Sequence, residues 1–226
     1  MDFTRAIGDT SGGSTNSTAG TSGASGQPIV DLGDRDYTVI LKAHGAMMFI
    51  AWGVAPFFGI FIARYLKNAL GHNWYRLHVF FMLGITGLFT LIGFIIIVLF
   101  APPPHFRTTH AHRPIGLFMF IALFIQIALG FVANHMFDPN RPGVPWWDKA
   151  HWWLGRSLFV LGIINVYLGI NLFSNYGDIN MPLITGLYWA WVVIGFVALL
   201  AGNFKIGQKH HMAGNYAAPI DSVESL

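Results

Sequence analysis

Five long apolar segments dominate this chain of 226 residues. A helix of about 20 residues crosses the roughly 30 Å hydrocarbon layer of a bilayer. We expect membrane-spanning helices at about 37–66, 73–100, 112–137, 148–174 and 183–203, with a kink at Pro56 in the first. Only 10% of the residues are charged, against about 25% in soluble domains. The sequence therefore predicts an all-α integral membrane protein with five transmembrane helices.

The two ends of the chain differ from this apolar region. Residues 11–26 read SGGSTNSTAGTSGASG, a composition typical of flexible linkers. We interpret residues 1–36 as an extracellular Gly/Ser/Thr-rich linker, 37–203 as the transmembrane domain and 204–226 as a cytoplasmic tail. No apolar signal-peptide core is visible near Met1. We expect that the chain derives from a longer precursor, the alternative being that the first span directs insertion.

Positive charge is distributed unequally between the two sides of the predicted membrane domain. Cytoplasmic loops of membrane proteins carry an excess of Lys and Arg. One side holds Arg64, Lys67, Arg76, Arg141, Lys149, Arg156, Lys205 and Lys209, and the other holds Arg5, Arg35, Lys42, Arg107 and Arg113. The sequence therefore predicts a multi-pass protein with an extracytoplasmic N-terminus and a cytoplasmic C-terminus. Short loops make neighbouring helices antiparallel.

Four histidines stand near the ends of the first four predicted spans. With this topology His44 and His112 lie near the outer face, whereas His78 and His151 lie near the inner face. Measured along the first two helices, the two levels differ in depth by roughly 25 Å, at about 1.5 Å per residue. The sequence thus predicts two histidine pairs, one near each face of the bilayer.

A pair of histidines from facing helices is typical of haem ligation. Zinc requires four ligands, whereas haem iron already has four ring nitrogens and needs two axial ones. Gly116 and Gly155 follow His112 and His151 by four residues, on the same helical faces, and would give a haem edge room to approach. The chain has no cysteine, which excludes thiolate-ligated haem and iron–sulfur clusters. Two occupied axial positions favour electron transfer over oxygen chemistry.

Other interpretations of these residues remain open at this point. A histidine at a helix end is often only an interfacial residue, and His110 and His135 compete with His112 and with the inner pair. Two alternative functions are a histidine-gated transporter and a passive membrane anchor for an outer domain. From Tyr37 to Phe137 the chain has no Asp or Glu, which argues against a transporter with a mid-membrane carboxylate. The net charge of +3 gives no reason to expect nucleic-acid binding.

Four strings of this sequence resemble a known family. AHGAMMFIAWGVAPFFGIFIARYLK, WYRLHVFF, HRPIG and HWWLGRSLFVLGIINVYLGI occur in order between Leu41 and Asn175. They are similar to the cytochrome b561 family, and above all to the cytochrome domain of proteins that fuse it to an extracellular DOMON domain. The resemblance implies a four-helix dihaem core with a peripheral C-terminal helix. By motif it assigns His44, His78, His112 and His151 as the ligands of two non-covalent haem b groups, and so favours His112 over His110.

The resemblance also implies partners for this membrane domain. It suggests a transmembrane oxidoreductase of the ascorbate-dependent or ferric reductase type, with ascorbate as the cytosolic reductant. The extracellular acceptor would be a ferric chelate or a DOMON-like redox domain, although MDFTRAIGDT resembles at most the last strand of such a domain. Arg64, Lys67 and Arg76 would attract an anionic donor, or serve only the positive-inside rule. Arg107 and Arg113 would pair with haem propionates, or only solvate the loop.

Overall fold

The computed structural model describes residues 34–101, 110–138, 140–174 and 180–216, with side chains described between 37 and 202. The predicted linker and Arg107 lie outside the described residues. Within the described ranges the chain is helical and contains no strand. Helices long and apolar enough to cross a membrane run from Tyr37–Leu70, Asn73–Phe100, His112–His135, Trp146–Phe173 and Met181–Gly202. The predicted all-α fold with five spans is therefore confirmed.

The first two spans alternate α-helix with wider, π-helical turns. The first consists of α1 (Asp34–Met48), η1 (Phe49–Val54), α2 (Ala55–Phe61), η2 (Ile62–Leu66) and α3 (Lys67–Leu70). The second consists of α4 (Asn73–Val79), η3 (Phe80–Gly87) and α5 (Leu88–Phe100). Between them the chain turns at Gly71, whose φ of 52° lies in the region that favours glycine. Pro56, where the sequence predicts a kink, is the second residue of α2, and the chain remains helical through it.

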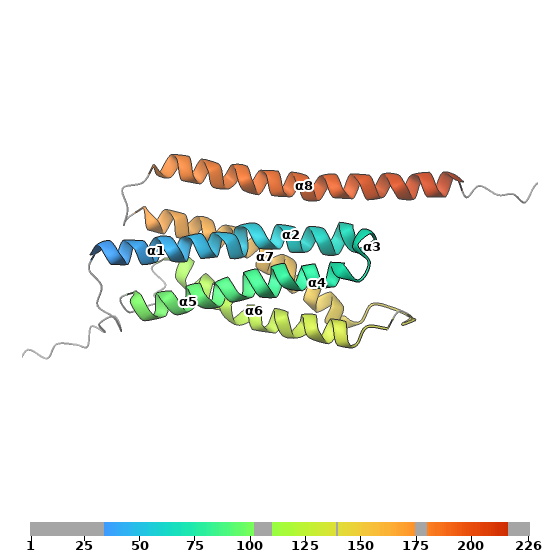
Figure 1. Ribbon diagram of the computed structural model, residues 1–226, viewed down its shortest axis with the longest axis horizontal. Coiled ribbons are helices and arrows are strands. Elements are labelled where there is room, and N and C mark those ends of the chain that lie inside the picture. The colour runs from blue at the N-terminus through green and yellow to red at the C-terminus, as the bar shows by residue number, and fades with distance from the viewer. Residues whose placement is uncertain (1–33, 102–109, 139, 175–179, 217–226) are drawn as a thin grey trace, which may run out of the picture.

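The other three spans are continuous α-helices. They are α6 (His112–His135), α7 (Trp146–Phe173) and α8 (Met181–Tyr216), so that α8 continues past residue 203, the predicted end of the fifth span. Figure 1 shows the first four spans packed lengthwise, with α8 along the outer side of the bundle. The most extensive helix–helix contacts join α6 to α7 and α1 to α5, and α8 packs against α7 and α2. The chain thus forms two antiparallel helix pairs and a flanking helix.

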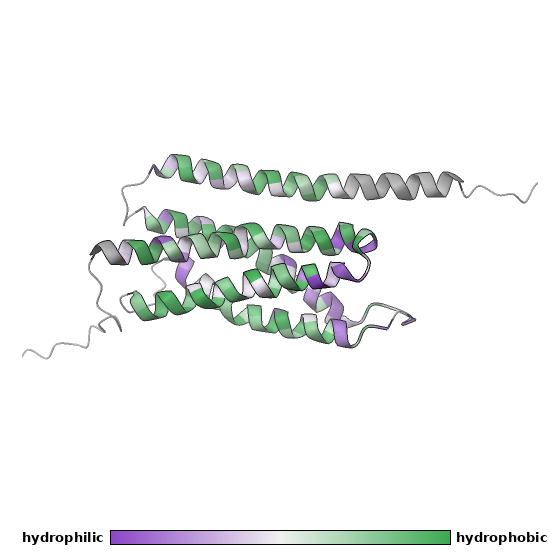
Figure 2. Ribbon diagram, in the orientation of Figure 1, coloured by the Kyte–Doolittle hydropathy of each residue, from purple (hydrophilic) through white to green (hydrophobic). Residues whose placement is uncertain are grey.

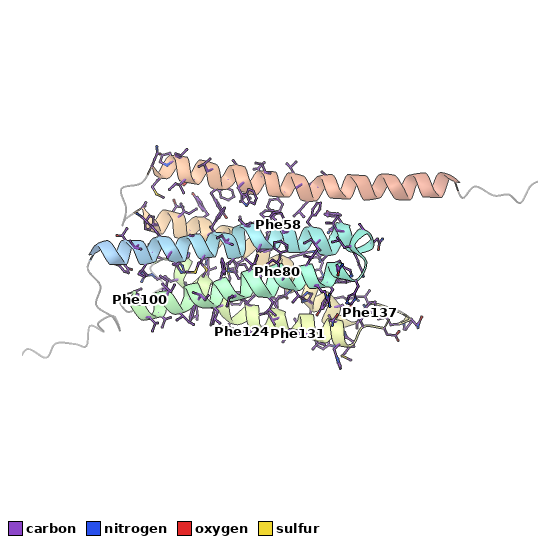
Figure 3. All side chains as sticks on the ribbon, viewed as in Figure 1. Phe58, Phe80, Phe100, Phe124, Phe131 and Phe137 are labelled. Carbon is purple, nitrogen blue, oxygen red and sulfur yellow. The ribbon has the colours of Figure 1, made fainter. Side chains whose placement is uncertain are left out.

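Apolar side chains cover the outside of the bundle as well as its centre. Ala51, Trp52, Met119 and Leu158 belong to the buried core. Figure 2 shows that the helices are hydrophobic along most of their length, with hydrophilic residues gathered toward their ends. Phenylalanines such as Phe58, Phe80, Phe124 and Phe131, labelled in Figure 3, are exposed on the outer surface. In water such a surface would be costly, whereas against lipid chains it is the expected exterior of a membrane domain.

Candidate functional site

Each of the four predicted histidines is held by a backbone carbonyl on the neighbouring helix of its pair. The carbonyl oxygen accepts a hydrogen bond from Nδ1, so Nδ1 carries the hydrogen and Nε2 keeps its lone pair. Histidines that ligate a metal are commonly oriented in this way. The bonds join His44 to Gly93 (3.0 Å), His78 to Gly59 (3.0 Å), His112 to Asn165 (2.9 Å) and His151 to Gln126 (3.3 Å).

These histidines lie at two levels, with a histidine from each helix pair at each level. We call His44 and His112 the outer pair and His78 and His151 the inner pair, after the predicted orientation. The ring centroids of the outer pair are 6.2 Å apart, with ring planes at 89°. Two metal–nitrogen bonds of about 2.0 Å, plus about 1.1 Å from each nitrogen to its ring centre, span about 6.2 Å. The outer rings therefore have the spacing of two axial ligands. The inner pair is close enough to interact electrostatically.

Glycines on the facing helices make room for the histidine rings. A Cβ atom at Gly169 would lie 2.9 Å from Cε1 of His112, and one at Gly130 would lie 3.0 Å from Cε1 of His151. A Cβ at Gly93 would be in ordinary contact with Nδ1 of His44, at 3.5 Å, and would instead clash with Cε of Met48, at 2.3 Å. Sequence reasoning did not assign these three glycines to the histidines, because the facing positions depend on the register between helices.

The two glycines that the sequence singled out face carboxamide side chains. A Cβ at Gly155 would lie 2.6 Å from Nε2 of Gln126, and one at Gly116 would lie 3.4 Å from Nδ2 of Asn165. The Gln126 amide uses the space at Gly155 to donate a 3.0 Å hydrogen bond to the carbonyl of His151. Among the described residues, the oxygens of both carboxamides are buried without a hydrogen-bond partner. The carboxamide of Gln126 thus contacts the backbone of a predicted ligand, whereas that of Asn165 lies beside Gly116.

A cavity of about 530 Å³ lies at the outer pair. Pockets that hold small molecules and cofactors commonly measure about 300–1,000 Å³ and are mainly apolar. Both outer histidines line it, together with Gly116 and Arg113, two of the predicted cofactor contacts. Its wall is formed by α1, α5, α6, α7 and also the N-terminal part of α8. Lys42, which sequence reasoning did not assign to the site, also lines the cavity.

The cations of the predicted donor site are exposed at the inner end. Nζ of Lys67 lies 5.0 Å from the centre of the Trp74 ring, and that ring lies 6.5 Å from the ring of His78. Lys67 is therefore connected to the inner pair through an aromatic side chain. The guanidinium of Arg64 lies over its neighbour Tyr65. Sequence reasoning also missed an ion pair between Arg141 and the buried carboxylate of Asp148.

The donor set is compatible with haem. Among the described residues, His, Asp and Glu side chains do not form groups of three or more that could hold a metal ion. A haem iron needs two axial ligands beyond its four ring nitrogens. The Nδ1 hydrogen bonds, the ring spacing and the apolar cavity at the outer pair all fit such a group. The competing histidines His110 and His135 are exposed.

Comparison with known proteins gives a family for this chain. Ferric-chelate reductase 1 of Bos taurus is 27% identical over 186 residues, which cover 80% of this chain and 29% of that protein. A cytochrome b561, DM13 and DOMON domain-containing protein of Arabidopsis thaliana is 30% identical over 182 residues, covering 74% of this chain and 19% of that protein. The chain thus spans less than a third of these relatives. No solved structure matches. A family model described as eukaryotic cytochrome b561 matches residues 43–174, more than half of the sequence, and the chain therefore belongs to the cytochrome b561 family.

Proposed function

We propose that this membrane domain transfers electrons across the bilayer with two b-type haems, one held by the outer pair and one by the inner pair. The observation that carries this proposal is the outer pair, whose rings lie 6.2 Å apart and whose Nδ1 atoms each donate to a carbonyl. Bound haem supplies one-electron chemistry, because its iron is stable in two oxidation states.

The residues of this chain would orient and enclose each haem. A hydrogen-bonded Nδ1 fixes the tautomer and the orientation of the ring, and Nε2 would then be the nitrogen that holds the metal. The two histidines of each pair would hold the iron, and the bound haem would supply electron transfer. At the outer pair, Arg113 and Lys42 line the cavity and are suited to neutralise haem propionates through charge-assisted hydrogen bonds.

The names of the relatives suggest the partners at each face. One relative is a ferric-chelate reductase, and another carries a DOMON domain. We therefore infer an extracytoplasmic acceptor that is a ferric chelate or a redox domain of the same protein. The donor is a cytosolic reductant, with ascorbate as our candidate, drawn to the cationic inner end by Lys67, Arg64 and Arg76.

A visible spectrum of the detergent-purified protein tests the cofactor. We expect sharp reduced bands and about two haems per chain. His44→Ala and His78→Ala should each remove about half of the haem, because each substitution destroys one pair. A colourless, well-folded protein would overturn the proposal and would favour the histidine-gated transporter or the passive anchor.

Stopped-flow mixing with ascorbate tests the donor separately. The reduced bands should appear within seconds, and they should appear more slowly in Lys67→Gln, with Lys149→Gln as an exposed control on the predicted inner side. Reduction by dithionite without reduction by ascorbate would discard ascorbate and leave the cofactor assignment intact.

A further inference from the structure

The hydrogen bonds of the histidines follow one register along each helix pair. In the first two spans, the number of residues from His44 to Gly59 equals the number of residues from His78 to Gly93. In α6 and α7, the number of residues from His112 to Gln126 likewise equals the number of residues from His151 to Asn165. These intervals between the two levels are each one residue shorter in α6 and α7 than in the first two spans. The two helix pairs therefore connect the same two levels with helices that differ by one residue.

One extra residue is a serious mismatch for a continuous α-helix. The shorter interval equals two heptads, which keep a side chain on nearly the same face. One further residue would rotate everything beyond it by about 100° and shift it by about 1.5 Å. In a plain α-helix, Gly59 would then be offset from His44 by about 60° around the helix axis in one direction, whereas Gln126 is offset from His112 by about 40° in the other. The same difference of about 100° holds for His78 and Gly93. The structure shows both residues of each span at the helix interface.

The π-helical turns lie where the extra residue has to be absorbed. η1 lies between His44 and Gly59, and η3 lies between His78 and Gly93. In η1 the N–H of Ala55 donates to the carbonyl of Ile50, five residues earlier. Leu88 donates in the same way to Leu83. A turn closed by such a bond contains one residue more than an α-helical turn. In α6 and α7 the corresponding intervals are continuous α-helix.

The two π-helical turns also meet in the middle of the bundle. The hydroxyl of Thr86 in η3 donates a 2.9 Å hydrogen bond to the carbonyl of Ala51 in η1, and Thr86 is only 1% exposed. This bond joins residues that are level in the same register, midway between the two histidine levels. The extra residue of each span is thus accommodated at one shared position.

We infer that η1 and η3 are positioning elements for the four histidines: each absorbs one residue, so that the longer intervals in the first two spans match the shorter ones in α6 and α7. This inference rests on the proposed haem ligation, and it assigns a role to residues that touch no metal. It implies that a residue can be removed from η1 without loss of either haem, whereas a residue removed from α7 between the two levels cannot be tolerated.

Single deletions of valine provide a matched test. Val54 ends η1, and its φ of −118° and ψ of −61° depart from α-helical values. Deleting Val54 makes the interval between His44 and Gly59 as long as those in α6 and α7. It leaves the number of residues between His44 and Ala51 unchanged. Val160 lies on the exposed side of α7, between His151 and Asn165. Val132 lies in α6 beyond Gln126, outside the intervals, so its deletion controls for the loss of a membrane residue.

The measurements are recovery of monodisperse protein from detergent and the haem-to-protein ratio of the recovered fraction. We expect the Val54 and Val132 deletions to keep at least four-fifths of the parental ratio. The Val160 deletion should lose half or more, or should not be recovered. Loss of haem or of recovery in the Val54 deletion, with Val132 tolerated, would overturn the inference, as would a Val160 deletion that keeps both haems. A parental protein without haem would instead refute the proposed function.

Discussion

At the scale of single residues, neutral backbone groups orient the four histidines. Their Nδ1 atoms donate to backbone carbonyls, two of which belong to the carboxamide residues Asn165 and Gln126. Gln126 contacts His151 twice, because its side-chain amide also donates to the His151 carbonyl. A buried carboxylate would serve a similar orienting purpose at a much higher cost within the membrane. Neutral hydrogen bonds therefore suit this position.

Gln126→Leu should loosen the inner pair selectively. The substitution removes the amide bond to the His151 carbonyl but keeps the backbone acceptor of Nδ1, so we expect a loss of about 1 kcal/mol. On gradual heating, haem should leave the inner site at a lower temperature than in the parental protein, while the outer haem is retained. Ile125→Leu, at an exposed neighbouring position, is the control. Equal release from both sites would contradict this assignment.

At the scale of elements, α8 is attached to the bundle by side chains that donate to backbone carbonyls. Trp191 donates to Gly53 in η1 (2.7 Å), Tyr188 to Ile163 in α7 (2.6 Å) and Tyr65 to Leu199 in α8 (2.5 Å). Such bonds fix the position of a helix in a membrane, where apolar packing alone provides little driving force. Although α8 lies outside the four-helix bundle in Figure 1, its N-terminal part also lines the outer cavity.

Tyr188→Phe should therefore destabilise the protein at the outer pair. Loss of one buried hydroxyl bond costs about 1 kcal/mol, which corresponds to a decrease in melting temperature of about 2–4 °C for a domain of this size. The outer haem should be released before the inner one, which is the opposite order to Gln126→Leu. Trp189→Phe, at a more exposed position of the same helix, should leave the melting temperature unchanged. Preferential release of the inner haem would contradict the role of α8.

At the scale of the whole molecule, hydropathy was enough to predict the five spans, because a membrane crossing needs a long apolar helix whatever its neighbours are. The position of His44, His78, His112 and His151 near helix ends was likewise visible in the sequence. The glycines opposite the rings and the π-helical turns were not, because both depend on the register between helices. The ion pair of Arg141 with Asp148 was not predicted either, because the conformation of the intervening turn decides whether the two side chains meet.

The orientation of the whole molecule remains a prediction that follows from its charge distribution. Because the parental chain has no cysteine, single cysteines can report each face without background. His110 and Asn68 are exposed at opposite ends of the bundle, beside α6 and within α3. A membrane-impermeant maleimide should label His110→Cys in intact cells and Asn68→Cys only after permeabilisation, because the excess of Lys and Arg retains the Asn68 end in the cytoplasm. The opposite pattern would place the outer pair at the cytoplasmic face and would reverse the predicted direction of electron flow.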